Sequence, residues 1–148
     1  MSNGNDDIVK AIASNPNTPL ELLIKLAKDY PNQFLKNPAL DLYLLEDINL
    51  LAQMPESTFT SLLTTKQIPE SFILFALNNR QTPQILKSIL IFHTDLWNQW
   101  RQNNPTTSIS LKGVDLQGVN LKNTNLQSVN LRGVKINNKT KIYYKWLT

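Results

Sequence analysis

The sequence has one histidine, His93, and it stands directly before Thr94 and Asp95. Histidine, hydroxyl and carboxylate groups together can relay a proton, but a working relay brings them from separate segments onto one substrate. Three neighbours in the chain do not converge in this way, so we interpret His93 as a surface residue near a helix end. We expect no catalytic residues, and the sequence predicts a protein that is not an enzyme.

Ligands for a metal or a cofactor are equally scarce. The chain has no cysteine, which excludes disulfides, iron–sulfur clusters and cysteine zinc sites. The pairs Asp6-Asp7 and Glu46-Asp47 have no ligand loop around them, and such pairs are usually solvated or lie at helix ends. The four glycines form no phosphate-binding motif. The sequence therefore predicts neither a metal nor a cofactor.

Two segments combine aromatic and basic residues, as binding surfaces do. Trp97 and Trp100 lie on one side of a predicted helix and Arg101 follows them, so they would form either a stacking platform or an aromatic seam between domains. The segment "KTKIYYKW" fits contact with nucleic acid, and it fits equally a cap with lysines at its rim. The candidate partner contacts are Trp97, Trp100, Arg101, Lys139, Lys141, Tyr143, Tyr144, Lys145 and Trp146.

Charge is divided unevenly along the chain. Residues 1–100 hold 7 Lys and Arg against 10 Asp and Glu, whereas residues 101–148 hold 8 against 1. A basic end of this kind attracts an acidic partner, nucleic acid or a membrane surface, and its plainest interpretation is a solvated face. The longest apolar run, Phe72 to Leu77, is far too short to cross a bilayer, and the N-terminal "MSNGNDD" is polar. We expect a cytoplasmic protein without a membrane partner.

A recurring proline organises the N-terminal part. It opens four similar segments, "NTPLELLIKLA", "QMPESTFTSLL", "QIPESFILFAL" and "QTPQILKSILI", and a fifth, "LDLYLLEDI", has Asp41 at that place. From Asp41 onward this position recurs at equal intervals, at Pro55, Pro69 and Pro83. Proline is favoured in the first turn of a helix, and Thr18 and Thr82 stand in the cap position before it. Each segment is predicted to be a short helix, which must pack on its neighbours to be stable.

Two of these helices are preceded by an Asn-Pro turn signal, the first of them within residues 11–28. Asn15-Pro16 and Asn37-Pro38 each stand before a leucine-rich run. This pattern resembles the leucine-rich-repeat-variant family, whose units join an Asn-Pro turn to a helix. The resemblance implies a right-handed superhelix of stacked helices, and it weakens after residue 28 because the later units follow one another more closely. Members of that family can carry a cysteine-bound iron–sulfur cluster, for which this chain has no ligand.

A five-residue period dominates the C-terminal third. Residues 111–136 place Leu or Ile at every fifth position, and an odd spacing cannot keep to one face of a strand, because alternate side chains point to opposite sides. The conflict disappears if the chain turns a corner in each pentapeptide, which then forms one side of a square coil. Strand alternation points a second residue inward, two positions before each Leu or Ile. The predicted core residues are Ile109, Leu111, Val114, Leu116, Val119, Leu121, Thr124, Leu126, Val129, Leu131, Val134 and Ile136.

The residues between and after these positions complete a repeating pattern. The outward residue is polar in all six units, and the corner residues Gly113, Gly118, Asn123, Ser128 and Gly133 are small or turn-forming. The pattern resembles the pentapeptide-repeat family, which implies a right-handed quadrilateral β-helix with four pentapeptides per coil. Six units make only one and a half coils, so both ends need covers. The helices would cover one end and the tail "NNKTKIYYKWLT" the other, unless the tail docks onto a second copy and forms a homodimer.

Together these patterns predict an α+β protein with four parts. A helical repeat domain spans residues 6–102, a linker 103–107, a pentapeptide-repeat β-helix 108–138 and a C-terminal cap 139–148. Repeat folds present extended surfaces that bind other proteins, so we expect a non-enzymatic protein–protein interaction module or adaptor. The alternative is a nucleic-acid-binding protein, in which Lys139, Lys141 and Lys145 contact phosphates while Tyr143 or Trp146 stacks on bases.

Overall fold

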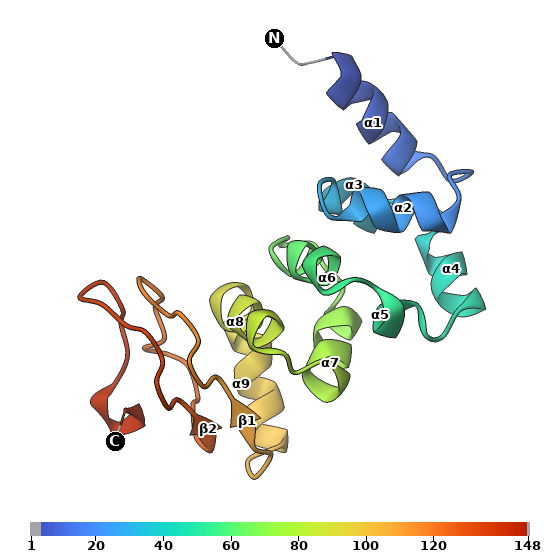
Figure 1. Cartoon of the computed structure of the whole chain (residues 1–148). Helices are drawn as coiled ribbons and strands as arrows, with labels where there is room; N and C mark the ends of the chain where they lie inside the picture. Colours follow the sequence, from blue (N-terminus) through green and yellow to red (C-terminus); the bar gives the residue numbers. More distant parts are fainter. Residues whose placement is uncertain (1–3, 148) are drawn as a thin grey trace. The chain divides into compact units, whose positions relative to one another are not determined.

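The computed structural model describes residues 4–147 and divides the chain into two compact units, with the division after Pro69 (Figure 1). Within the described residues there are nine α-helices, one two-stranded parallel sheet and a final 3-10 turn. The chain is thus mostly helical, with its strands in the pentapeptide segment. The predicted domain boundary at residues 103–107 is corrected, because this segment lies inside the second unit.

The N-terminal unit, up to Pro69, is built from short helices. They are α1 (Gly4–Ser14), α2 (Leu20–Ala27), α3 (Pro31–Leu35), α4 (Leu40–Glu46), α5 (Leu50–Gln53) and α6 (Glu56–Leu63). Helix α3 packs against α1, α2 and α6, and α2 also packs against α1 and α6. The helices bury apolar side chains in a core that includes Ala13, Leu23, Ala27, Phe34 and Leu62.

Prolines start the helices much as the sequence predicts. Pro19 and Pro55 directly precede α2 and α6, while Pro83 is the first residue of α8 (Pro83–Phe92). Thr82 caps α8, because its side-chain oxygen accepts the Ile85 N–H at 3.4 Å. The matching prediction for Thr18 is wrong, since Pro19 occupies the N-cap position of α2. The Thr18 hydroxyl instead donates to Ile12 O at 2.7 Å, which ties the end of α1 to the following turn.

The two Asn-Pro turns are joined by the side chain of Asn37, which is buried. Its Nδ2 donates to Ala13 O at 2.9 Å and to Asn15 O at 3.0 Å, while its Oδ1 accepts the Ala39 N–H at 2.9 Å. One amide therefore closes its own turn and also holds the earlier turn at Asn15. This contact gives the repetition of Asn-Pro in the sequence a structural reason.

Asn37→Ala is expected to destabilise the N-terminal unit by about 2–3 kcal/mol, because the buried carbonyl of Ala13 and the part-buried carbonyl of Asn15 lose their donor. All 3 tryptophans of the chain lie in the C-terminal unit. Urea unfolding followed by far-UV circular dichroism should show the loss, whereas the tryptophan fluorescence transition should keep its midpoint. The control is Asn17→Ala, since Asn17 is exposed in the same turn. Equal stabilities for the two variants would contradict this role of Asn37.

The C-terminal unit, from Glu70 onward, combines three helices with the pentapeptide segment. Its further elements are α7 (Glu70–Asn79), α9 (Thr94–Asn103), β1 (Ile109–Ser110), β2 (Val129–Asn130) and the 3-10 turn η1 (Tyr144–Trp146). Helix α9 packs against α7 and α8, and the Trp100 indole Nε1–H donates to Asn78 Oδ1 on α7 at 2.9 Å. Strands β1 and β2 lie side by side beyond α9 (Figure 1).

Residues 109–141, which we call the coil, pair with themselves at a fixed offset. Strands β1 and β2 are parallel, and Ile109 pairs with Val129. An isolated parallel bridge repeats the same offset at Asp115 and Lys135, and the last bridge joins Asn120 to Lys141. The offset equals the length of four pentapeptides, so the backbone returns to its starting column after four repeats. The last bridge spans one residue more, which shows that the repeat ends before Lys141.

Burial in the coil follows the five-residue period through its first turn and weakens after it. Residues Ile109, Leu111, Val114, Leu116, Val119, Leu121, Thr124 and Leu126 are buried. Val129, Leu131 and Val134 are only half-buried, and Ile136 is 43% exposed. The prediction that these four lie in the core is corrected. They belong to an incomplete second turn, where an inward side chain has a neighbouring turn on one side only.

The outward residues of the coil hold its corners together. In five successive units the side-chain oxygen accepts the backbone N–H two residues later, at 3.4, 3.0, 3.3, 3.1 and 3.0 Å. Ser, Asp and Asn side chains favour this local turn. This hydrogen bond to the Gln117 N–H also lowers the pKa of Asp115 below its ordinary value. The polar outward positions are therefore structural, and the residues are Ser110, Asp115, Asn120, Asn125 and Asn130.

Four corner residues adopt left-handed backbone, with φ of 72°, 74° and 69° at Gly113, Gly118 and Gly133 and 59° at Ser128. Gly118→Ala should destabilise the C-terminal unit by about 1–2 kcal/mol, because a side chain is strained in this region. No atom beyond the two chain neighbours lies within 4 Å of the added Cβ, so strain alone sets the cost. Asn123→Ala, at a corner that is not left-handed, is the control and should cost much less. Equal midpoints in thermal unfolding followed by tryptophan fluorescence would count against this explanation.

Candidate functional site

Three of the predicted partner contacts, Trp97, Trp100 and Arg101, are buried inside the C-terminal unit. The Arg101 guanidinium lies 5.9 and 5.8 Å from the two ring centroids. Its Nη1 donates to Thr107 O at 2.8 Å, and its Nη2 donates to Pro105 O at 3.2 Å and also to Gln127 O. Burial lowers the pKa of Arg101 from its ordinary value. As a correction, these residues join α9 to the coil and offer no surface to a partner.

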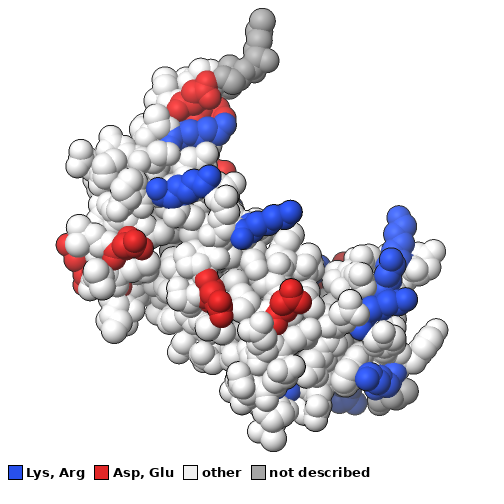
Figure 2. Space-filling model, turned by 180° about the vertical axis from the view of Figure 1, so that it is seen from behind, with Lys and Arg blue, Asp and Glu red and all other residues white. Residues whose placement is uncertain are grey.

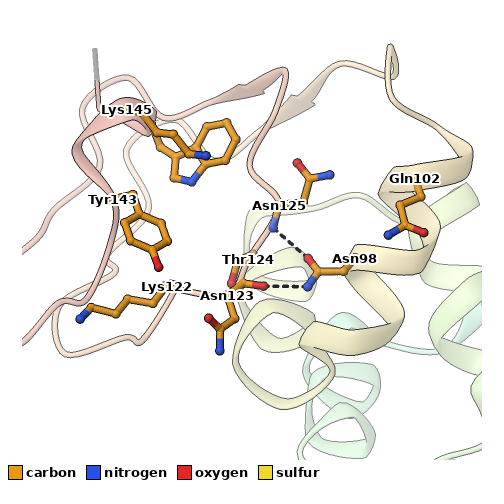
Figure 3. Close-up of a pocket in the computed structure, with 9 residues that line it drawn as sticks. Asn98, Gln102, Lys122, Asn123, Thr124, Asn125, Tyr143 and Lys145 are labelled. Atoms are coloured by element: carbon orange, nitrogen blue, oxygen red, sulfur yellow. Dashed lines mark hydrogen bonds between the residues drawn. The ribbon is translucent and has the colours of Figure 1, made fainter.

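Helix α9 also holds residues 123–125 of the coil, through the side chains of Asn98 and Trp97. Asn98 Nδ2 donates to Asn123 O at 2.7 Å, and Asn98 Oδ1 accepts the Asn125 N–H at 2.8 Å (Figure 3). The Trp97 indole Nε1–H donates to Asn125 O at 2.8 Å. The helix therefore pairs with the backbone of this side of the coil, as a neighbouring strand would. These bonds fix one wall of a hollow.

The hollow, which we call the cleft, lies between α9, residues 122–125 of the coil and the C-terminal turn. Its volume is about 360 Å³. Figure 3 shows Asn98 and Gln102 on the α9 side, with Tyr143 and Lys145 facing them from the tail. Of the predicted contacts, this cleft brings together Tyr143, Lys145 and Trp146. The lining residues are Asn98, Gln102, Lys122, Asn123, Thr124, Asn125, Tyr143, Lys145 and Trp146.

The described lining of the cleft is cationic and rich in hydrogen-bond donors. It contains two lysines and four amide side chains, and none of the nine residues carries a carboxylate. Lys145 Nζ lies 4.5 Å from the Trp146 ring centroid and 5.9 Å from that of Tyr143. The arrangement suits binding of a group that accepts hydrogen bonds and bears negative charge.

The remaining predicted contacts, Lys139, Lys141 and Tyr144, are exposed and lie outside the described cleft lining. Tyr144 is 85% exposed. The backbone of Lys141 is already used, because its N–H donates to Val119 O and its carbonyl accepts from Leu121. Figure 2 shows Lys and Arg side chains gathered over this part of the chain.

A second surface, on the N-terminal unit, is apolar. Leu42 and Leu45 lie one helical turn apart on α4, and Ile48 follows in the turn before α5. Leu45 is 84% and Ile48 88% exposed, and Leu42 is exposed as well. We call these three residues the α4 face. Glu46 and Asp47, which stand between Leu45 and Ile48 in the sequence, carry carboxylates, and Asp47 Oδ1 accepts the Asn49 N–H at 2.9 Å.

His93, Thr94 and Asp95 line an open hollow together with Phe92 and Leu96, and all five residues are consecutive. The Thr94 hydroxyl donates to Leu90 O at 2.9 Å, which is a local helix contact. Among the described residues, no group of three or more His, Asp or Glu side chains is placed to hold a metal ion. Within residues 4–147, no helix has the length and apolar content that a membrane crossing requires.

Sequence reasoning missed the amide residues of the cleft. Gln102 and Asn98 are ordinary polar residues of a helix, and no spacing or motif marks them. Asn125 is identified in the repeat only as an outward residue. Of these amides only Asn123 stands out in the sequence, because it occupies a corner and three of the other four corners have glycine. Its carbonyl accepts from Asn98 on α9.

Comparison with known proteins supports one part of the sequence interpretation. Residues 107–138 match the family model for pentapeptide repeats (8 copies). The resemblance of residues 11–28 to the leucine-rich-repeat-variant family finds no support. No curated protein and no solved structure matches the chain.

Proposed function

We propose that the protein is a non-enzymatic protein–protein interaction module, whose principal contact is the α4 face. The observation that carries this proposal is the exposure of Leu45 and Ile48, 84% and 88%, next to a third apolar residue, Leu42. Contiguous exposed apolar surface bordered by polar groups is typical of a site that another protein covers. The carboxylates of Glu46 and Asp47, next to Leu45 and Ile48 in the sequence, favour a partner segment that carries basic residues beside apolar ones.

The coil is the rigid second part of this proposed module. We propose that it forms a right-handed quadrilateral β-helix, closed on α9 by the backbone contacts of Arg101 and Asn98. The pairing of Ile109 with Val129 and of Asp115 with Lys135 supports this geometry. Its half-buried end, at Val129 and Leu131, is a place where a second copy would dock to form a homodimer. Light scattering checks this, since a mass of one chain at micromolar concentration would exclude a stable dimer.

The α4 face is tested by removing its two most exposed side chains. The variant Leu45→Ser with Ile48→Ser should keep its fold, because both residues are exposed, yet lose a binding partner. Truncating two central apolar contacts typically costs about 2 kcal/mol or more, close to a thirtyfold loss of affinity. Affinity capture and mass spectrometry with the native protein should identify a partner that this variant fails to retain.

The matched control for that capture is Ile8→Ser. Ile8 is also an exposed apolar residue of the N-terminal unit, but it lies on α1. The control variant should retain the same partner as the native protein. If all three proteins capture the same set, the α4 face is not the contact.

Nucleic-acid binding is the second candidate, favoured by the exposed rings of Tyr143 and Tyr144 near basic residues. Its phosphate contacts would be Lys139, Lys141 and Lys145. This function predicts an affinity for DNA or RNA that falls steeply with salt, because binding releases counterions. The interaction module predicts little binding at about 0.15 M salt. A fluorescence anisotropy series between low and physiological salt separates the two functions.

A further inference from the structure

One residue of the cleft lining, Trp146, has a buried hydrogen-bond donor. The Trp146 indole Nε1 is buried and has no hydrogen-bond acceptor among the described residues. The other two indoles of the chain do have acceptors, Asn125 O for Trp97 and Asn78 Oδ1 for Trp100. A buried N–H without an acceptor is unfavourable, and in native proteins it calls for an explanation such as a bound ligand.

Positive charge is placed next to this donor. Lys145 precedes Trp146 in the chain, and its Nζ lies 4.5 Å from the centroid of the indole ring. The ring therefore helps to hold the ammonium group at the cleft. Lys122 adds a second cation to the lining, and none of the described lining residues carries a carboxylate.

We propose that the cleft binds an oxyanion, a phosphate or carboxylate group, through the Lys145 ammonium and the Trp146 indole N–H. An anion supplies the acceptor that the N–H lacks, and its negative charge is favoured beside the Lys145 ammonium. A ligand held mainly by base stacking is less suited, because Lys145 already lies over the Trp146 ring. The oxyanion site is independent of the α4 face, so either proposal can fail without the other.

The test uses the indole N–H signals in ¹⁵N-correlated NMR spectra of the full chain. Three such signals are expected, and Trp146→Phe identifies the one that belongs to Trp146. Inorganic phosphate, titrated at constant ionic strength set with chloride, should move the Trp146 signal along a saturable curve, with a dissociation constant of about 1 mM for a partly exposed site. The signals of Trp97 and Trp100, which already have acceptors, should stay in place.

Lys145→Gln should weaken phosphate binding about five- to tenfold, because it removes a charged hydrogen-bond donor. Its control is Lys112→Gln, which removes the same charge from an exposed position of the coil outside the cleft lining. The control should keep the native dissociation constant. A Trp146 signal that does not saturate, or equal weakening by both variants, would overturn the proposal.

Two further titrations identify the source of the anion. Acetate replaces phosphate in one, and a short peptide with a single phosphoserine is compared with its unphosphorylated form in the other. Tighter binding of the phosphopeptide than of free phosphate assigns the site to a partner's side chain, and equal binding assigns it to the free anion. Either result supports the oxyanion site, whereas no saturable change with any of these probes overturns it.

Discussion

Arg101→Met is expected to destabilise the C-terminal unit by about 3–5 kcal/mol, because three backbone carbonyls would lose the charged donor that the buried Arg101 side chain supplies. The three acceptors are Pro105 O, Thr107 O and Gln127 O. Domains are typically stable by only about 5–15 kcal/mol, so the variant should populate unfolded coil under native conditions. Urea unfolding followed by tryptophan fluorescence measures this loss directly, because two of the three tryptophans flank Arg101.

Two controls separate the hydrogen bonds of Arg101 from its charge. Arg101→Lys keeps the charge and part of the donor capacity, so its loss should be clearly smaller. Lys112→Met removes one charge from an exposed position of the coil and should leave the midpoint nearly unchanged. If Arg101→Met were as mild as Lys112→Met, Arg101 would not be the residue that fastens the coil to α9.

Leu116→Ala should destabilise the C-terminal unit by about 2–5 kcal/mol, the usual range for a buried leucine that leaves a cavity. Leu116 is fully buried in the first turn of the coil. Ile136 has the same place in the five-residue period but is 43% exposed, so Ile136→Ala should cost less than about 1 kcal/mol. Thermal and urea unfolding of the two variants, with tryptophan fluorescence as the signal, compare the losses.

The contrast between these two variants tests the corrected extent of the core. Equally large losses of stability for Leu116→Ala and Ile136→Ala would mean that the second turn is as well packed as the first. Equally small losses would mean that the leucines do not form a core at all.

The five-residue period predicted the interior of the coil well in the first turn, since alternation and corners are local properties of the sequence. Leu111, Leu116 and Leu121 are all fully buried. The period is equally regular at Ile136, yet burial fails there. Whether an inward side chain is covered depends on a neighbouring turn of the coil, and this is not encoded in the repeat itself.

The helices after recurring prolines were predictable for a similar reason, because a proline and a capping residue act within one turn. The domain boundary, in contrast, was not predictable from the sequence. The segment "NNPTT" is a clear breaker in the sequence, but Arg101 binds the carbonyls of Pro105 and Thr107 within it. A linker and a tethered loop have the same composition, and only the tertiary contacts distinguish them.

The candidate site was predictable only in part. The aromatic and basic residues of the tail suggested Tyr143, Lys145 and Trp146, which line the cleft. The same reasoning suggested Trp97 and Trp100, which are buried, because aromatic residues one helical turn apart look alike in a seam and on a surface. The amides of α9 carry no sequence signal, since their role comes entirely from packing against the coil.

The most direct test of the structure is a nuclear Overhauser measurement on the coil in solution. The pairing predicts backbone contacts between residues four pentapeptides apart, at Ile109 with Val129 and at Asp115 with Lys135. It also predicts slow hydrogen exchange at the amides of Leu111 and Leu116, which donate to Asn130 O at 2.9 Å and Lys135 O at 2.8 Å. Contacts typical of a continuous helix through 111–136, or the absence of contacts between these paired residues, would contradict the coil.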